Sequence, residues 1–179
     1  IQLLSIVTGN LFTVTFGFNL IKKQKPPEYT IAVYMLLTQL FVIAVSALNL
    51  FKPYVSNTFL PAMATLLIMA IIQLVALILV ARYVKTNYAH PRMIWLAFPI
   101  ILTAVTGNIF ALVLGINLLA KIRKNGNPAM TRWGDVWVKL TANQTAMSGL
   151  FFVVFLFCLS VSSLFTFDYS IAIDNNYSA

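Results

Sequence analysis

Residues 93–120 read MIWLAFPIILTAVTGNIFALVLGINLLA, an apolar run without a charged side chain. Its centre, Val105-Thr106-Gly107-Asn108-Ile109-Phe110, has a counterpart near the start of the chain, Val7-Thr8-Gly9-Asn10-Leu11-Phe12. Between positions 7–23 and 105–121, nine of seventeen residues are identical at a constant offset of 98. Self-similarity at a fixed offset indicates an internal duplication.

The composition is typical of a protein in a lipid bilayer. Of the 179 residues, 60% are hydrophobic and 9% are charged, so polar side chains are too few to cover a surface in water. Five apolar runs are close to the roughly 20 residues that cross a hydrocarbon core, and in lipid such runs must be helical to satisfy their backbone groups. We therefore expect an all-α integral membrane protein with about five transmembrane helices, over 1–21, 30–51, 59–81, 93–120 and 147–167.

These runs are expected to form a single membrane domain over residues 1–179. The two copies of the repeat lie in the first and fourth runs, so three crossings separate them. If all five runs span, the copies are antiparallel, as in the inverted repeats of many transporters and channels. Repeat A would comprise 1–51 and repeat B 93–167, with the helix 59–81 as a linker. If one run is re-entrant, the copies are parallel instead.

Basic residues do not orient a five-span arrangement. Six Lys and Arg residues would face each side of the membrane. Membrane proteins usually have more Lys and Arg on the cytoplasmic side, but here the two sides are equal and the rule does not tell which side is cytoplasmic. A re-entrant run would let the basic clusters at the ends of both copies face the cytoplasm. In either case we expect these clusters to contact anionic lipid headgroups: Lys22, Lys23 and Lys25 after copy one, and Lys121, Arg123 and Lys124 after copy two.

Small residues recur every fourth position inside each copy. Four residues advance a helix by about 400°, so each trio forms a nearly straight groove that lets another helix approach closely. We expect the helices of 1–21 and 93–120 to cross each other at these grooves, which comprise Gly9, Thr13 and Gly17 in copy one and Gly107, Ala111 and Gly115 in copy two.

Among the amides of the apolar runs, four lie well inside a run. A buried amide without a partner is costly, so each is expected to bond to a neighbouring helix or, as the alternative, to a polar solute. They are Asn10, Gln39, Gln73 and Asn108.

The segment 128–141 has the pattern of a helix in the headgroup region. Asn127-Pro128 is a helix-start signal, and Trp133, Val136, Trp137 and Leu140 follow at helical spacing. Trp133 and Trp137 would lie at the membrane interface, with basic neighbours towards anionic lipid. The alternative is an ordered loop that docks on a partner subunit.

Chemistry-bearing residues are few. The chain has four acids, none within an apolar run, together with one histidine, His90, and one cysteine, Cys158. Metal sites and catalytic sets need clusters of such residues, so we expect no metal, no cofactor and no enzymatic activity. The net charge of +8 is scattered along the chain, a pattern that favours lipid phosphates over nucleic acid.

The sequence therefore predicts a non-catalytic polytopic membrane protein that acts as a helix-packing subunit of a larger membrane complex or homo-oligomer. Its expected partners are membrane lipids and other membrane subunits or copies of itself. The alternative is a channel or carrier for a neutral or lipid-like solute, built on the inverted repeat. That alternative predicts a polar cavity at mid-depth.

Overall fold

A computed structural model describes residues 27–48, 55–84, 92–123 and 132–168, and the regular elements in these ranges are helices. Three of them are long and apolar enough to cross a membrane: α3 (Pro27–Leu48), α4 (Phe59–Val84) and α8 (Gln144–Thr166). The others are α5 (Arg92–Thr103), the short 3₁₀ helix η2 (Ala104–Thr106), α6 (Ile109–Arg123) and α7 (Arg132–Ala142). The predicted all-α class is confirmed, and the run 1–21 lies outside the described residues.

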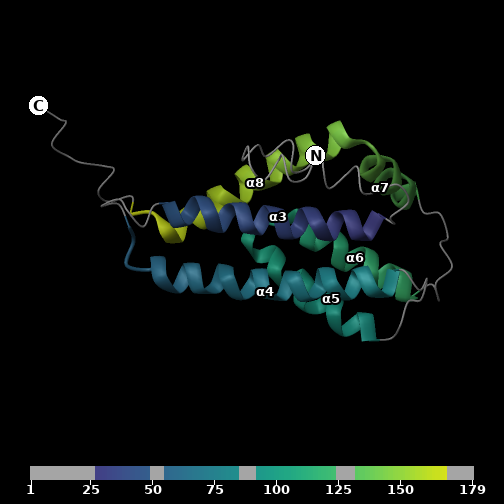
Figure 1. Cartoon of the computed structure of the whole chain (residues 1–179), viewed down its shortest axis with the longest axis horizontal. Helices are drawn as coiled ribbons and strands as arrows, with labels where there is room; N and C mark the ends of the chain where they lie inside the picture. Colours follow the sequence, from purple (N-terminus) through teal and green to yellow (C-terminus); the bar gives the residue numbers. More distant parts are fainter. Residues whose placement is uncertain (1–26, 49–54, 85–91, 124–131, 169–179) are drawn as a thin grey trace, which may run out of the picture.

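Helix α3 is the centre of the bundle. It packs against α4, α6, α7 and α8 (Figure 1). The ring of Tyr34 lies 5.8 Å from that of Phe110 on α6 and 5.9 Å from that of Phe151 on α8. All three side chains are buried. The core is thus an aromatic cluster where three helices meet, and such close packing replaces the hydrophobic drive that lipid removes.

The run 93–120 does not form the single spanning helix expected from the sequence. Helices α5 and α6 have 12 and 15 residues, which at 1.5 Å per residue makes them about 18 and 22 Å long, short of a hydrocarbon core of about 30 Å. They pack side by side as a hairpin (Figure 1). A Cβ built on Gly115 of α6 would lie 3.2 Å from the carbonyl oxygen of Ala97 on α5. We call α5, η2 and α6 the hairpin and residues 104–108 its tip.

The residues that end the helix lie in the tip and directly before it. The hydroxyl of Thr103 donates to the carbonyl oxygen of Ile100 at 2.7 Å, and that of Thr106 to the carbonyl oxygen of Thr103 at 2.9 Å. These hydroxyls bond to carbonyl groups near the end of the helix, as Ser and Thr do where a membrane helix is interrupted. Gly107 then reverses the chain with φ at +86°, a conformation that only glycine adopts at low cost.

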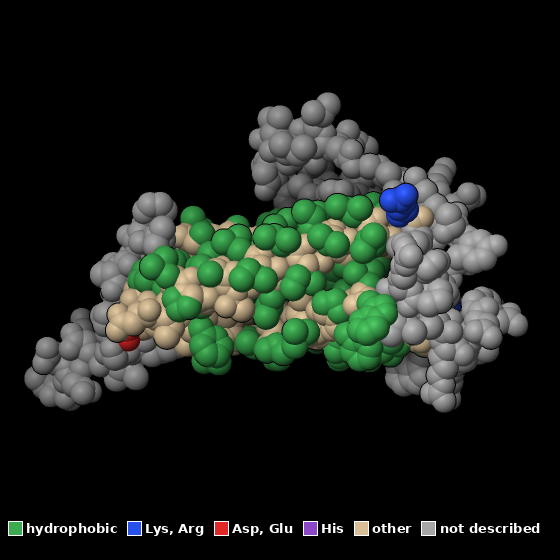
Figure 2. Space-filling view, turned by 90° about the horizontal axis from the view of Figure 1, so that it is seen from below, with side chains coloured by type: hydrophobic (Ala, Val, Ile, Leu, Met, Phe, Trp, Pro, Cys, Tyr) green, Lys and Arg blue, Asp and Glu red, His purple; other side chains and the backbone are tan. Residues whose placement is uncertain are grey.

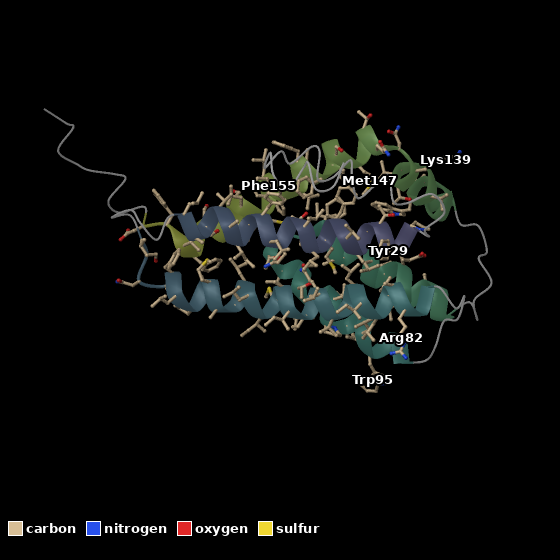
Figure 3. The ribbon with its side chains drawn as sticks, viewed as in Figure 1. Tyr29, Arg82, Trp95, Lys139, Met147 and Phe155 are labelled. Carbon is tan, nitrogen blue, oxygen red and sulfur yellow. The ribbon has the colours of Figure 1, made fainter. Side chains whose placement is uncertain are left out.

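The hairpin enters and leaves at one end of the bundle, where α3 begins and α4 ends (Figure 1). Arg82 and Lys139 lie towards this end (Figure 3), where Figure 2 shows Lys and Arg side chains in blue, and we call it the basic end. In the sequence, eleven of the twelve Lys and Arg residues are in the segments that adjoin it, and only Lys52 adjoins the opposite, far end. The six-to-six balance expected from the sequence required 93–120 to cross the membrane, and it is removed by the hairpin.

Helix α7 begins at Arg132, four residues after the expected start at Pro128, and residues 124–131 are outside the described ranges. Its Trp137 and Leu140 are partly buried against the hydrophobic core. Asn143 separates α7 from α8, and its side-chain oxygen accepts a hydrogen bond from the backbone N–H of Ala146 at 3.2 Å. This cap satisfies one of the free N–H groups at the start of α8.

Candidate functional site

Asn108 joins the tip of the hairpin to the central helix. Its Nδ2 donates to the carbonyl oxygen of Met35 at 2.9 Å, and the side chain is fully buried. Met35 is the ninth residue of the 22-residue α3, so the tip lies near the middle of that helix. An amide placed there holds two helices together and fixes the depth to which the hairpin reaches.

Gln73 joins the same hairpin to α4. Its Nε2 donates to the hydroxyl oxygen of Thr103 at 3.2 Å. Because that hydroxyl already donates its hydrogen to Ile100, the oxygen can only accept from Gln73. The orientation of the Gln73 amide is therefore determined by its neighbour.

Gln39 bonds α3 to α4, because its Nε2 donates to the carbonyl oxygen of Leu66 at 3.1 Å. Of the four amides singled out in the sequence, the three that lie in the described residues thus each donate to a neighbouring helix. The fourth, Asn10, lies outside the described residues. The side-chain oxygens of Asn108 and Gln73 are buried and accept no hydrogen bond. An unsatisfied buried acceptor costs free energy, so these two amides do not satisfy all of their hydrogen-bonding groups.

The small-residue groove of copy two is shorter than expected from the sequence. Gly107 lies in the turn, outside both helices, whereas Ala111 and Gly115 are buried on α6. A Cβ on Gly115 would overlap Cγ1 of Ile101 on α5. The close helix contact at Gly115 is therefore made within the hairpin. The groove expected in copy one, Gly9, Thr13 and Gly17, lies outside the described residues.

A cavity of about 380 Å³ lies between the tip, the first half of α4 and the last part of α8. Its walls are mostly apolar, with Val105 and Thr106 at the tip and Val161 and Phe165 on α8. From α4 and the residue before it come Thr58, Pro61, Ala62, Thr65, Leu66 and Met69. The cavity is open to the outside of the bundle, because Val105 and Phe165 in its wall are 72% and 56% exposed. In a bilayer, whatever surrounds the protein at this depth can enter it.

The hydroxyl groups in the cavity wall already donate their hydrogens. Thr65 donates to the carbonyl oxygen of Pro61 at 2.8 Å, and Thr106 to that of Thr103. Ser162 donates to the carbonyl oxygen of Leu159 at 3.0 Å. A buried water needs two to four polar partners, and these hydroxyls can offer it only their oxygen atoms as acceptors. Because the rest of the wall is mostly apolar, the cavity suits an apolar occupant better than water.

Thr58 lines the cavity at the far end of the bundle. Its hydroxyl donates to the carbonyl oxygen of Phe165 at 2.7 Å and lies 2.8 Å from the hydroxyl of Ser56. This bond ties the residue before α4 to the end of α8. The cavity consequently has a deep apolar part at the tip and a hydroxyl-bearing rim at the far end.

For most of the residues that were expected to contact lipid headgroups, the side chains lie outside what the structure describes. Lys22, Lys23, Lys25 and Lys124 lie outside the described residues. Lys121 and Arg123 lie in the last turn of α6, and Trp133 lies in the first turn of α7, but only their backbone is described. Trp137 is the exception, and it is half-buried against the core.

Sequence reasoning did not identify the cavity or the interruption of 93–120. The available signal was the cluster Thr103, Thr106, Gly107 and Asn108 in the middle of an apolar run, which combines a turn glycine with residues that bond to backbone groups. The wall residues on α4 and α8 carry no such signal. Their role depends on which helices face each other.

The fold defines an all-helical protein with three helices suited to crossing a membrane and a shorter apolar hairpin between them. No known protein family, curated protein or solved structure matches the chain.

Proposed function

We propose that this chain is a non-catalytic integral membrane protein that acts by helix packing, as a subunit of a larger membrane complex or as a homo-oligomer. The observation that carries the proposal is the use of its interior amides. Asn108, Gln73 and Gln39 each donate to a neighbouring helix. Amides used in this way stabilise one arrangement of helices, whereas a path for a polar solute needs them directed towards a shared cavity.

The partner surface in this proposal is the outer face of the hairpin. Trp95, Phe98 and Leu102 follow at helical spacing on α5 and are exposed by 80%, 59% and 65%. Together they form one continuous apolar stripe from the basic end towards the tip. We infer that a partner subunit packs on this stripe and covers its large side chains. It would also stabilise the hairpin, which reaches only part of the bilayer depth.

The proposal is tested by the mass of the purified particle in mild detergent and in nanodiscs. Wild-type protein is expected to elute as an oligomer or with fixed partners, and the double variant Phe98→Ala/Leu102→Ala as a smaller particle. The matched control is Ile71→Ala/Ile78→Ala, which removes two exposed apolar side chains of α4 and should leave the mass unchanged. A wild-type monomer that carries a solute across liposomes by itself would contradict the proposal.

The distribution of Lys and Arg residues also favours one orientation of the protein in the membrane. Lys and Arg residues concentrate in the short cytoplasmic segments of membrane proteins, and eleven of the twelve adjoin this end. We therefore place the basic end in the cytoplasm. This end also holds Glu28, which lies in the first turn of α3, where the helix dipole favours an acid.

A carrier for a lipid-like solute is the second candidate, and the cavity beside the tip is the observation that favours it. The inverted repeat on which it was based requires copy two to lie in a helix that crosses the membrane, whereas copy two begins in the turn of the hairpin and continues along α6. Copy one lies outside the described residues. Transfer of a fluorescent phospholipid between leaflets of reconstituted vesicles tests this candidate.

A further inference from the structure

We propose that the cavity beside the tip holds one acyl chain of a membrane phospholipid, with the headgroup at the far end of the bundle. The wall of the cavity runs along α4 from Thr58 to Met69, a distance of about 16 Å at 1.5 Å per residue. This distance is half of a hydrocarbon core of about 30 Å. The cavity thus has the length of the chain region of one leaflet.

The short hairpin explains why the protein leaves a space between α4 and α8 at the depth of one leaflet. The tip lies near the middle of α3, as the bond between Asn108 and Met35 shows. From the tip to the far end, α4 and α8 therefore have no hairpin residue beside them, and Val105 and Thr106 form the deep wall of the space that remains. In a bilayer the material that surrounds such a space is lipid.

The polarity of the cavity matches that of a phospholipid along its length. The deep part has Met69, Leu66 and Val105 in its wall. At the rim the hydroxyl of Thr58 already donates to Phe165 and that of Ser56 lies on Thr58, so neither hydroxyl bonds the headgroup. The rim adjoins the N-terminus of α4, where anionic groups are stabilised, and this favours a phosphate headgroup at the far end with the apolar chain inside.

The cavity opens to the outside of the bundle, because Pro61, Thr65 and Phe165 in its wall are exposed. An acyl chain can therefore enter it sideways from the bilayer. The length of about 16 Å and the mostly apolar wall together favour a single unbranched chain as the occupant.

The test uses the full chain in phosphatidylcholine vesicles that contain a phosphatidylcholine with a diazirine at the end of one acyl chain. The sample is transferred to detergent before irradiation, so that bulk lipid is removed and only retained lipid can label the protein. Mass spectrometry is expected to find adducts at Met69 and at Thr106, the buried residue of the tip that lines the cavity. Ile71, which is exposed on α4, should be labelled in vesicles but lose its label after the transfer.

Two matched variants assign the adducts to the cavity. Ala62→Trp fills the cavity from its α4 wall and should abolish most of the retained labelling, whereas Ala64→Trp, at an exposed position of α4, should preserve it. If Ala62→Trp does not fold, Thr65→Leu fills a smaller part of the same wall and should lower the labelling. Absence of adducts at Met69 and Thr106 in the wild type, or equal labelling of the two variants, would overturn the inference. The particle mass reports on the subunit proposal separately.

Discussion

Helix α4 and the hairpin are built from nearly the same kind of sequence but have different structures. The run 59–81 and the run 93–120 are both apolar and free of charge. Yet α4 continues for 26 residues from Phe59 to Val84, while the other run turns back at Gly107. Length and hydropathy therefore determine that a segment can lie in lipid, but they do not determine whether it crosses.

The difference comes from where each run places its polar side chains. In α4 the buried polar side chain is Gln73, which donates a hydrogen bond to Thr103 of the hairpin. This bond does not involve the backbone of α4, so the helix continues without interruption. In the hairpin, Thr103, Thr106 and Asn108 lie together with Gly107. The two Thr side chains bond to backbone carbonyls of the hairpin itself, and Asn108 bonds to α3. A turn in the apolar layer is tolerated when neighbouring protein groups satisfy it.

The largest expected effect is an all-or-none change in accessibility. In a Cys158→Ala background, Arg82→Cys and Lys139→Cys should both react with a membrane-impermeant maleimide from one side of oriented vesicles, and Asn57→Cys only from the other. All three positions are exposed. If 93–120 crossed the bilayer, Arg82→Cys and Lys139→Cys would react from opposite sides, and the difference between α4 and the hairpin would disappear.

The next effect is expected at the contact between the two arms of the hairpin. Gly115→Ala should lower the free energy of unfolding by about 1–3 kcal/mol, as overpacking does, because the added Cβ meets Ile101. Unfolding of the purified protein in increasing SDS measures this change. Ile101→Ala in the same chain should recover part of the loss. A neutral Gly115→Ala would mean that α5 and α6 do not pack this closely.

Gly107→Ala tests the turn itself. With φ at +86°, a side chain should cost about 1–2 kcal/mol, and its Cβ would also lie 2.9 Å from the ring of Phe157. The control is Gly149→Ala in α8, where nothing lies within 4 Å of the added atom, and which should stabilise the helix by about 1 kcal/mol. The same unfolding assay compares them, and a stabilising Gly107→Ala would argue for a continuous helix.

The smallest effect concerns the bond between α4 and the hairpin. A double-mutant cycle with Gln73→Leu and Thr103→Val should give a coupling energy of about 0.6 kcal/mol, the average for hydrogen bonds between membrane helices. Coupling near zero would remove this bond as a reason for the position of the hairpin. A value above about 1.7 kcal/mol would exceed that class of bond and indicate a larger rearrangement.

Much of the helical content could be predicted from the sequence. The runs 30–51, 59–81 and 147–167 correspond to α3, α4 and α8 within a few residues, because a long uncharged apolar segment is stable in lipid only as a helix. The spacing of Trp133, Val136, Trp137 and Leu140 likewise anticipated α7. These are local properties, and they can be read along one segment at a time.

The turn at Gly107 and the cavity were decided by tertiary structure. Asn108 bonds to the backbone of Met35 only because α3 lies beside the tip, and this partner is 73 residues away in the chain. The cavity likewise exists only because the hairpin stops short between α4 and α8. The sequence by itself determined that these segments are helical and belong in lipid, since this follows from side-chain hydropathy and backbone hydrogen bonding. How deep each segment reaches depended on contacts between segments far apart in the chain.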